Sequence, residues 1–166
     1  MKIRLASPLV TDSIVDGVGL RTTIFVQGCK RGCPGCHNPQ TWDVNGGFES
    51  DSEKIIAQLK KVKMQDGITL SGGEPFLQAA PLVEIAKFAH TVGWNVWTFT
   101  GYCFEELQQG EKAWRDLLKQ IDILVDGPFV LAKRSVDLFF KGSTNQRTLR
   151  LKNGVVVRRP DRKSVV

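Results

Sequence analysis

The sequence lacks a hydrophobic run that approaches the roughly 18 apolar residues of a membrane span. Its first residues, Met1 to Asp12, also lack the continuous apolar segment and small-residue cleavage site of a signal peptide. We therefore expect a cytoplasmic protein that does not enter a membrane. In the cytoplasm thiols stay reduced, and clustered cysteines are metal ligands or catalysts more often than disulfides.

Two common nucleotide-binding signatures are absent as well. The stretch from Asp16 to Gly19 lacks the third glycine of a dinucleotide fingerprint, and no Gly-x4-Gly-Lys-[Ser/Thr] loop occurs. The sequence shows no internal repeat. With 42% hydrophobic and 24% charged residues, its composition is that of an ordinary globular protein, and we expect residues 1–166 to form a single domain.

The formal net charge is +6, and much of the basic excess lies near the C-terminal end of the chain. Between Arg147 and Lys163 there are seven Lys or Arg residues and one acid, Asp161. No aromatic residues are interleaved to offer bases a stacking platform. We interpret the charges as solvent-exposed residues that keep the edge of a hairpin from pairing with other strands. We therefore expect no nucleic-acid partner.

Hydrophobic periodicity predicts strands that alternate with amphipathic helices. Ser50 and Glu53 have the spacing of a capping box at the start of the first helix. The predicted strands are 22–28, 67–75, 94–102 and 122–128, and the predicted helices are 50–62, 79–92 and 111–121.

This alternation implies right-handed βαβ units and a parallel sheet. A closed eight-fold barrel takes about 250 residues, so the chain is too short to close one. We expect an α/β fold with an open partial (β/α) barrel, in which one flank stays accessible to something large. The segment 147–159 differs, because Asn153-Gly154 between two apolar runs predicts a C-terminal type I′ β-hairpin.

Unusual residues follow each of the four predicted strands. Cysteines follow the first strand, Gly72 to Glu74 the second, Thr98 and Thr100 end the third, and Asp126-Gly127 ends the fourth. Ligands bind at the carboxyl ends of the strands in parallel α/β folds. The sequence therefore predicts one functional site at this edge.

Three of the four cysteines, Cys29, Cys33 and Cys36, lie within eight residues. Thiolates suit zinc or an iron–sulfur cluster. A zinc site could be completed by His37 or by the distant Cys103, although adjacent Cys36 and His37 are closer than zinc ligands usually are. A cluster would instead keep one iron without a protein ligand, which is an open position of the kind that catalysis needs.

The C-x3-C-x2-C spacing in Gly28–Pro39 resembles that of radical S-adenosylmethionine (SAM) enzymes. The resemblance implies that the three thiolates hold a 4Fe-4S cluster and that SAM binds its free iron. Members also carry a Gly-Gly-Glu-Pro segment after the second strand, here Gly72, Gly73, Glu74 and Pro75, which binds the SAM amino group. A carboxylate suits an ammonium, and glycine allows close backbone approach.

Six segments sharpen the resemblance: "DGVGLRT", "CPGCHNPQTW", "LSGGEPF", "WTFTGY", "LVDGPF" and "FKGSTNQR". In this order they are similar to the activating proteins of anaerobic ribonucleoside-triphosphate reductase. That family cleaves SAM to a 5′-deoxyadenosyl radical, which takes a hydrogen atom from a glycine of the reductase. The resemblance thus implies the reductase as a protein substrate and no acid–base catalytic residue. Lys30 and Arg31 would suit an acidic electron donor such as a reduced flavodoxin.

The remaining SAM contacts follow from the same resemblance. Many radical SAM enzymes place an aromatic residue before the last cysteine, against the adenine, whereas this chain has Gly35, so His37 is a candidate substitute. We expect further contacts at the third and fourth strand ends, from Thr98, Asp126, Gly127 and Pro128. Two alternatives stay open: a small-molecule radical enzyme of the 7-carboxy-7-deazaguanine synthase type, and a zinc-stabilised binding module.

Overall fold

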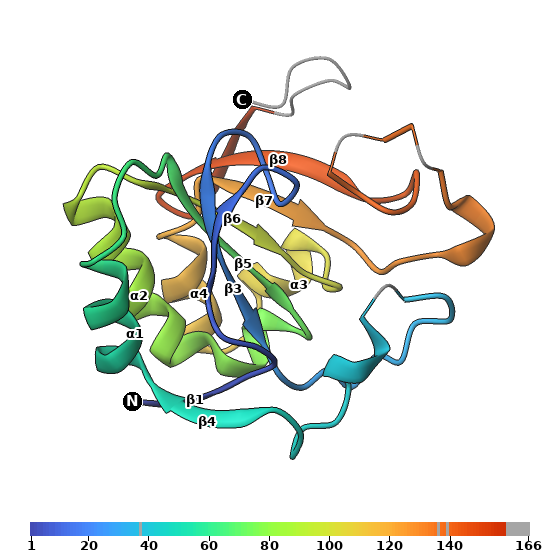
Figure 1. Ribbon diagram of the computed structural model, residues 1–166. Coiled ribbons are helices and arrows are strands. Elements are labelled where there is room, and N and C mark those ends of the chain that lie inside the picture. Colours follow the sequence, from blue (N-terminus) through green and yellow to red (C-terminus); the bar gives the residue numbers. More distant parts are fainter. Residues whose placement is uncertain (37, 136, 139, 159–166) are drawn as a thin grey trace.

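The computed structural model describes residues 1–166 except 37, 136, 139 and 159–166 (Figure 1). The strands of the described part are β1 Lys2–Leu5, β2 Val10–Ser13, β3 Arg21–Val26, β4 Phe48–Asp51, β5 Gly67–Gly72, β6 Asn95–Phe99, β7 Ile123–Asp126, β8 Arg147–Lys152 and β9 Val155–Arg158. The α-helices are α1 Ser52–Leu59, α2 Ala79–Thr91, α3 Phe104–Gln108 and α4 Lys112–Leu118. Short 3-10 turns are η1 Pro39–Thr41, η2 Pro75–Gln78 and η3 Leu131–Lys133.

The described strands form one mixed sheet in the order β4-β1-β3-β5-β6-β7-β8-β9, with β2 paired to β3. The pairs β3/β5, β5/β6 and β6/β7 are parallel, as the sequence predicts. Antiparallel strands extend both sides of this parallel centre. The sequence analysis missed β1, β2 and β4, so the sheet is not purely parallel.

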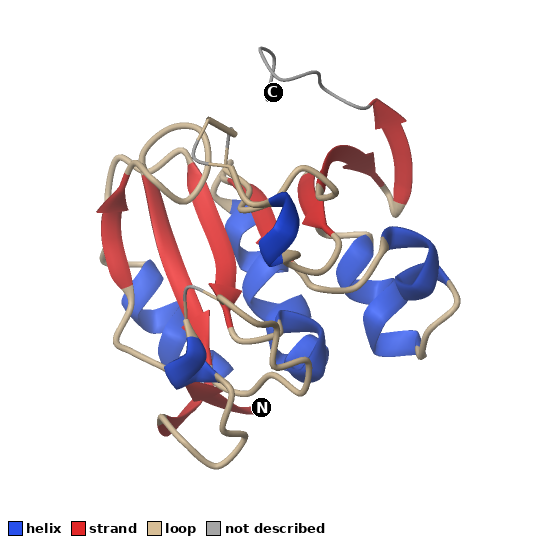
Figure 2. Ribbon diagram, turned by 90° about the vertical axis from the view of Figure 1, so that its right-hand side faces the viewer, coloured by secondary structure: helices blue, strands red, loops and turns tan. Residues whose placement is uncertain are grey.

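Side chains that alternate along the central strands face two different environments. Val96 and Leu124 belong to the main core, together with helix residues such as Leu82. Trp97 and Ile123 point the other way and form a smaller cluster. Helices α1, α2 and α4 lie on one side of the sheet in Figure 1, and Figure 2 views the molecule from the side where the long loops gather.

Helix α2 confirms the predicted amphipathic pattern, because Leu82, Ile85, Ala86 and Ala89 are all buried. The capping box predicted for the first helix is wrong. Asp51 is the N-cap, and its side chain accepts a hydrogen bond from the Glu53 N–H at 2.9 Å.

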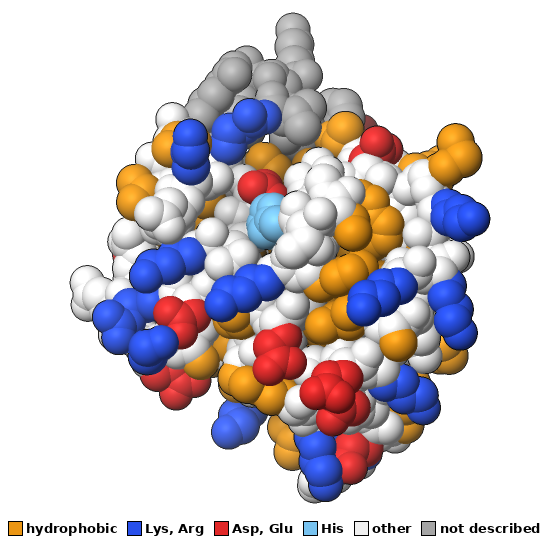
Figure 3. All heavy atoms as spheres, turned by 90° about the vertical axis from the view of Figure 1, so that its left-hand side faces the viewer, with side chains coloured by type: hydrophobic (Ala, Val, Ile, Leu, Met, Phe, Trp, Pro, Cys, Tyr) orange, Lys and Arg blue, Asp and Glu red, His pale blue; other side chains and the backbone are white. Residues whose placement is uncertain are grey.

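The predicted hairpin is confirmed, since β8 and β9 pair antiparallel across a turn with positive φ at Asn153 and Gly154. The helical face in Figure 3 carries basic and acidic side chains interspersed with apolar ones. No helix in the described part of the chain combines the length and apolarity that crossing a bilayer requires.

Candidate functional site

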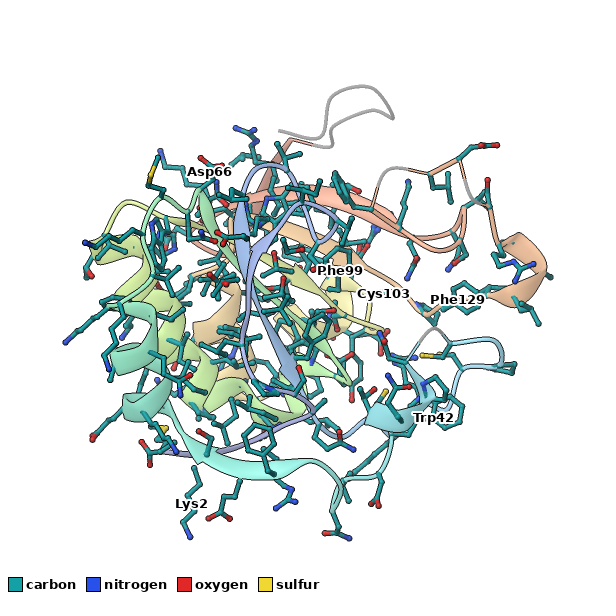
Figure 4. All side chains as sticks on the ribbon, viewed as in Figure 1. Lys2, Trp42, Asp66, Phe99, Cys103 and Phe129 are labelled. Atoms are coloured by element: carbon teal, nitrogen blue, oxygen red, sulfur yellow. The ribbon has the colours of Figure 1, made fainter. Side chains whose placement is uncertain are left out.

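A cavity of about 590 Å³ opens at the carboxyl ends of the four parallel strands. Each strand end contributes to its lining, as the sequence predicts. Its walls include Cys29, Cys33 and Cys36 after β3, Gly72, Gly73 and Glu74 at the end of β5, Phe99, Thr100 and Gly101 at the end of β6, and Val125, Gly127 and Phe129 at the end of β7. Figure 4 shows Phe99, Trp42 and Phe129 around this region.

The three clustered cysteines are free, half-buried thiols that share the cavity. The backbone N–H of Arg31 donates to Cys29, and that of Asn38 donates to the Cys36 Sγ at 3.4 Å. Burial raises the pKa of Cys29, while the Arg31 N–H opposes the rise. Amide hydrogens aimed at sulfur stabilise thiolates, so the donor set fits an iron–sulfur cluster.

The zinc hypothesis requires His37 or Cys103 as a fourth ligand beside the three clustered cysteines. Among the described residues, no group of three or more His, Cys, Asp or Glu side chains is gathered tightly enough to hold one metal ion. The predicted ligand His37 lies outside the described residues. Cys103 is half-exposed at the N-cap of α3 and does not line the cavity.

The cysteine loop is fastened to the Gly-Gly-Glu turn by backbone hydrogen bonds. The Gly73 N–H donates to the Val26 carbonyl and the Glu74 N–H to the Gly28 carbonyl, both at 2.8 Å. Gly72 has φ +100, and a Cβ there would lie 2.4 Å from the Val26 oxygen. A Cβ at Gly73 would lie 2.3 Å from the Gly28 oxygen, so only glycine permits this approach.

Glu74 is buried, and its carboxylate joins two strand ends. Oε1 accepts from the Gly101 N–H at 2.7 Å, Oε2 accepts from the Phe76 N–H at 3.0 Å, and the Thr100 hydroxyl lies within 3.0 Å of both oxygens. Burial raises the pKa of Glu74 more than these donors lower it. Three donors leave a carboxylate with capacity for one more hydrogen bond.

Arg31 reaches from the cysteine loop to the end of β6, where its guanidinium lies 4.6 Å from the centre of the Tyr102 ring. A Cβ at Gly101 would meet the Arg31 side chain at 2.5 Å, so the two are in contact. The Arg31 Nε is buried and has no hydrogen-bond partner among the described residues, and the side chain lines the cavity. This places a cation beside Glu74, whose pKa it lowers.

At Gly35 the cysteine loop touches the segment that follows β7. A Cβ on Gly35 would lie 2.7 Å from the Leu131 Cδ1 and 3.2 Å from the Phe129 Cε1. The Phe129 ring also lies against Gly142, where a Cβ would come within 2.9 Å. The missing side chain at Gly35 therefore makes room for Phe129 in the cavity wall.

The segment from Lys141 to Gln146 holds the loop after β7 in place. Gln146 Nε2 donates to the Gly127 carbonyl at 3.0 Å, and Asn145 Nδ2 donates to the Pro128 carbonyl at 2.8 Å. The Gln146 Oε1 accepts from the Gly142 N–H at 2.8 Å. These contacts give "KGSTNQR" a structural role that the sequence analysis did not assign.

Four predicted SAM contacts among the described residues lie outside the cavity lining: Gly35, Thr98, Asp126 and Pro128. Thr98 is buried within β6, and its hydroxyl has no partner among the described atoms. Asp126 is fully buried and bonded to Arg147 and to the Phe104 N–H. Pro128 follows Gly127, and only Gly127 lines the cavity.

The sequence analysis also missed residues that belong to the site. It placed Thr100 at a strand end without foreseeing that it binds Glu74, and it considered Arg31 only for an electron donor. Trp42, Phe129 and Gln146 line the cavity as well. The sequence signals located the strands and the cysteines. No signal in the sequence showed which loops contact one another.

Comparison with known proteins gives a consistent family. A family model described as a 4Fe-4S single cluster domain matches residues 15–149. The chain is 38% identical over 142 residues to the anaerobic ribonucleoside-triphosphate reductase-activating protein of Escherichia coli K12, covering 80% of this chain and 90% of that protein. The protein of the same name from Salmonella typhimurium is 40% identical over the same shares.

A protein of the same name from Enterobacteria phage T4 is 31% identical, and the match covers 85% of this chain and 90% of the phage protein. Among solved structures, QueE from Escherichia coli matches with a TM-score of 0.51 at 18% identity. That match spans 61% of this chain and 53% of QueE, and it supports a common fold.

Proposed function

Because this chain belongs to the family of anaerobic ribonucleoside-triphosphate reductase-activating proteins, we propose that it generates a glycyl radical on such a reductase. It is an iron–sulfur enzyme of the radical SAM type. The observation that carries the proposal is that three of its four cysteines, with the Gly72–Glu74 turn beside them, line one cavity. The relatives that match over most of both chains favour the activase over a small-molecule enzyme.

Cys29, Cys33 and Cys36 would hold the 4Fe-4S cluster, and the open iron would receive SAM. When bound and reduced, the cluster and SAM supply the 5′-deoxyadenosyl radical that removes a hydrogen atom from the substrate glycine. The chain itself positions and shields this chemistry. The N–H groups of Arg31 and Asn38 stabilise two of the thiolates.

The cavity wall supplies the SAM contacts in this proposal. Gly72 and Gly73 let the ligand approach the backbone, and the Glu74 carboxylate receives the SAM ammonium with its remaining acceptor capacity. Phe129, which lies against Gly35, offers an aromatic surface there. Of the residues that the resemblance assigns to SAM, Cys36, Gly72, Gly73, Glu74 and Gly127 line the cavity. The proposal also retains Gly35, His37, Thr98, Asp126 and Pro128 from the resemblance alone.

The proposal also covers the fold, the domain organisation, the cellular location and the electron donor. The mixed sheet would curve as an open partial barrel of the radical SAM type within one domain over residues 1–166. Its cytoplasmic location would keep the thiols reduced. Lys30 and Arg31, near the cavity, would suit an acidic electron donor such as a flavodoxin.

The test is reductase-dependent SAM cleavage under anaerobic conditions. With the cluster reduced, 5′-deoxyadenosine should form slowly in the protein alone and faster with the cognate reductase. The Cys36→Ala variant is the control and should form none. Turnover of a small pterin or deazapurine substrate, with no effect of the reductase, would replace this proposal with the small-molecule alternative.

A further inference from the structure

The loop between β2 and β3 presents two aliphatic side chains to solvent beside the cavity. Ile14 is 72% exposed and Val15 is 73% exposed. Among the large hydrophobic residues that the structure describes, only Met64 is more exposed. Val15 also lines the cavity, and Ile14 directly precedes it in the same loop. Exposed apolar side chains beside a functional cavity are typical of contact sites for a macromolecule.

The backbone beneath this pair is fixed. Asp16 Oδ2 accepts hydrogen bonds from the hydroxyls of Ser13 at 2.6 Å and Thr23 at 2.9 Å. The Thr69 hydroxyl donates to the Asp16 carbonyl at 2.7 Å. The loop is thus tied to both β3 and β5 immediately after Val15, and the exposure of the pair does not come from a detached loop.

The rest of the loop is anchored as firmly. The Val18 carbonyl accepts from the buried Arg21 guanidinium at 2.9 Å, and Arg21 lies 5.5 Å from the Trp97 ring centre. The Leu20 N–H donates to the Asp66 carboxylate at 2.7 Å. In Figure 1 this blue loop lies at the upper end of β3, opposite the cysteine loop. The cavity therefore extends from the cysteines at one end to Val15 at the other.

We propose that Ile14 and Val15 form the docking contact for the glycine-bearing loop of the protein substrate. The inference rests on the proposed function, which requires a backbone Cα–H of a second protein to reach the cavity. Two aliphatic side chains offer no hydrogen bond or charge, so the surface they form suits the apolar side chains of a docked loop. A fixed apolar surface lowers the ordering cost of binding such a loop.

The chain offers a matched control. Val155 and Val157 on β9 are 58% and 54% exposed, and neither lines the cavity. The test compares Ile14→Ser/Val15→Ser with Val155→Ser/Val157→Ser, each loaded with cluster and SAM. Binding to the cognate reductase is measured by anaerobic titration calorimetry. The first pair should bind about tenfold to a hundredfold more weakly, as expected for two lost apolar contacts, and the control pair should match the wild type.

Photo-crosslinking gives a second measurement that does not depend on how the substitutions fold. A benzophenone amino acid at position 14 should crosslink to the reductase peptide that contains the target glycine, whereas the same group at position 155 should not. Two results would overturn the docking surface. One is a wild-type affinity for the reductase in the Ile14→Ser/Val15→Ser variant, and the other is a crosslink from position 14 only to a remote part of the reductase. A wild-type protein that neither binds nor activates the reductase overturns the proposed function instead.

Discussion

The guanidinium of Arg147 donates hydrogen bonds to the carboxylate of Asp126, which is fully buried at the end of β7. The same guanidinium makes two hydrogen bonds to Glu105, at 2.8 and 2.9 Å. These contacts with Glu105 and Asp126 raise the pKa of Arg147. The pair fixes the end of β7 beside β8, next to Gly127 in the cavity wall.

Arg147→Ala should therefore destabilise the fold strongly, because it leaves the Asp126 charge buried without its partner. We expect a loss of about 3–5 kcal/mol in the free energy of unfolding, measured with urea. Glu105→Ala removes only the exposed side of the network and should cost about 1 kcal/mol or less. Equal losses in the two variants would show that the buried pair is not what stabilises this edge.

The roles of the cysteines predict a sharp division. Replacing Cys29, Cys33 or Cys36 with Ala should abolish the cluster, since each thiol lines the cavity and no spare one does. Cys103→Ala should keep both iron and SAM cleavage. Iron and sulfide analysis after anaerobic reconstitution measures the difference. Loss of iron in Cys103→Ala, with iron kept in one of the loop variants, would contradict the open-site arrangement.

Glu74→Ala should weaken SAM binding with the cluster intact. The substitution removes the carboxylate from the Phe76 and Gly101 N–H groups and from the proposed SAM ammonium. We expect a cost of about 2 kcal/mol or more in binding free energy. Thr100→Val, which keeps the carboxylate, is the control and should cost less. An unchanged SAM affinity in Glu74→Ala would remove this residue from the site.

Burial of Glu74 also predicts a dependence of stability on pH. Its pKa in the fold lies above the ordinary value of 4.5, so the fold binds its proton more tightly than the unfolded chain does. The contribution of this proton is present below the ordinary value and is lost as pH rises through the folded pKa. Relative to Glu74→Gln, the wild type should thus lose stability as pH rises above 4.5. Urea unfolding of both proteins across this range tests the slope, and a constant difference would argue against a shifted carboxyl.

The contact at Gly35 can be separated from its backbone conformation. Gly35 has φ +76 and close neighbours, whereas Gly93 has φ +80 and no atom of the described residues within 4 Å of an added Cβ. Gly93→Ala should cost about 1–2 kcal/mol from the backbone alone. Gly35→Ala should cost more and should also lower the iron content, because the methyl group pushes the cysteine loop away from Leu131 and Phe129. Similar losses, with iron unaffected, would show that the two loops do not depend on this contact.

Elements with a strong signal over many residues could be predicted from the sequence. The short strand β1 was missed although its buried Ile3 and Leu5 alternate with Lys2 and Arg4. Helix α2 and the β8–β9 hairpin carry their signals locally, in a four-residue apolar stripe and in Asn153-Gly154. Strands β2 and β4 read "VTDS" and "FESD", which show no buried alternation, so they were missed. Ser50 was mistaken for a cap because it pairs with Ile3 in the sheet, a contact that local sequence does not reveal.

The site likewise has features that local sequence predicts and contacts that it does not. Cysteine spacing and a double glycine at a strand end are local, and they located the cavity correctly. The partners of these residues come from loops that are distant in sequence. Thr100 reaches Glu74 from the next strand, and Phe129 fills the space beside Gly35. Such contacts depend on how the strand ends are arranged in space, which no single segment of the chain specifies.

The central claim is that this protein places a radical on a glycine of an anaerobic ribonucleoside-triphosphate reductase. Electron paramagnetic resonance of the reduced protein, SAM and the cognate reductase tests it most directly. We predict a doublet from the remaining α-hydrogen of the glycine, which collapses when the reductase carries α-deuterated glycine and disappears when the target glycine is replaced by Ala. A full complement of cluster and SAM cleavage with no glycyl signal on the reductase would contradict the account.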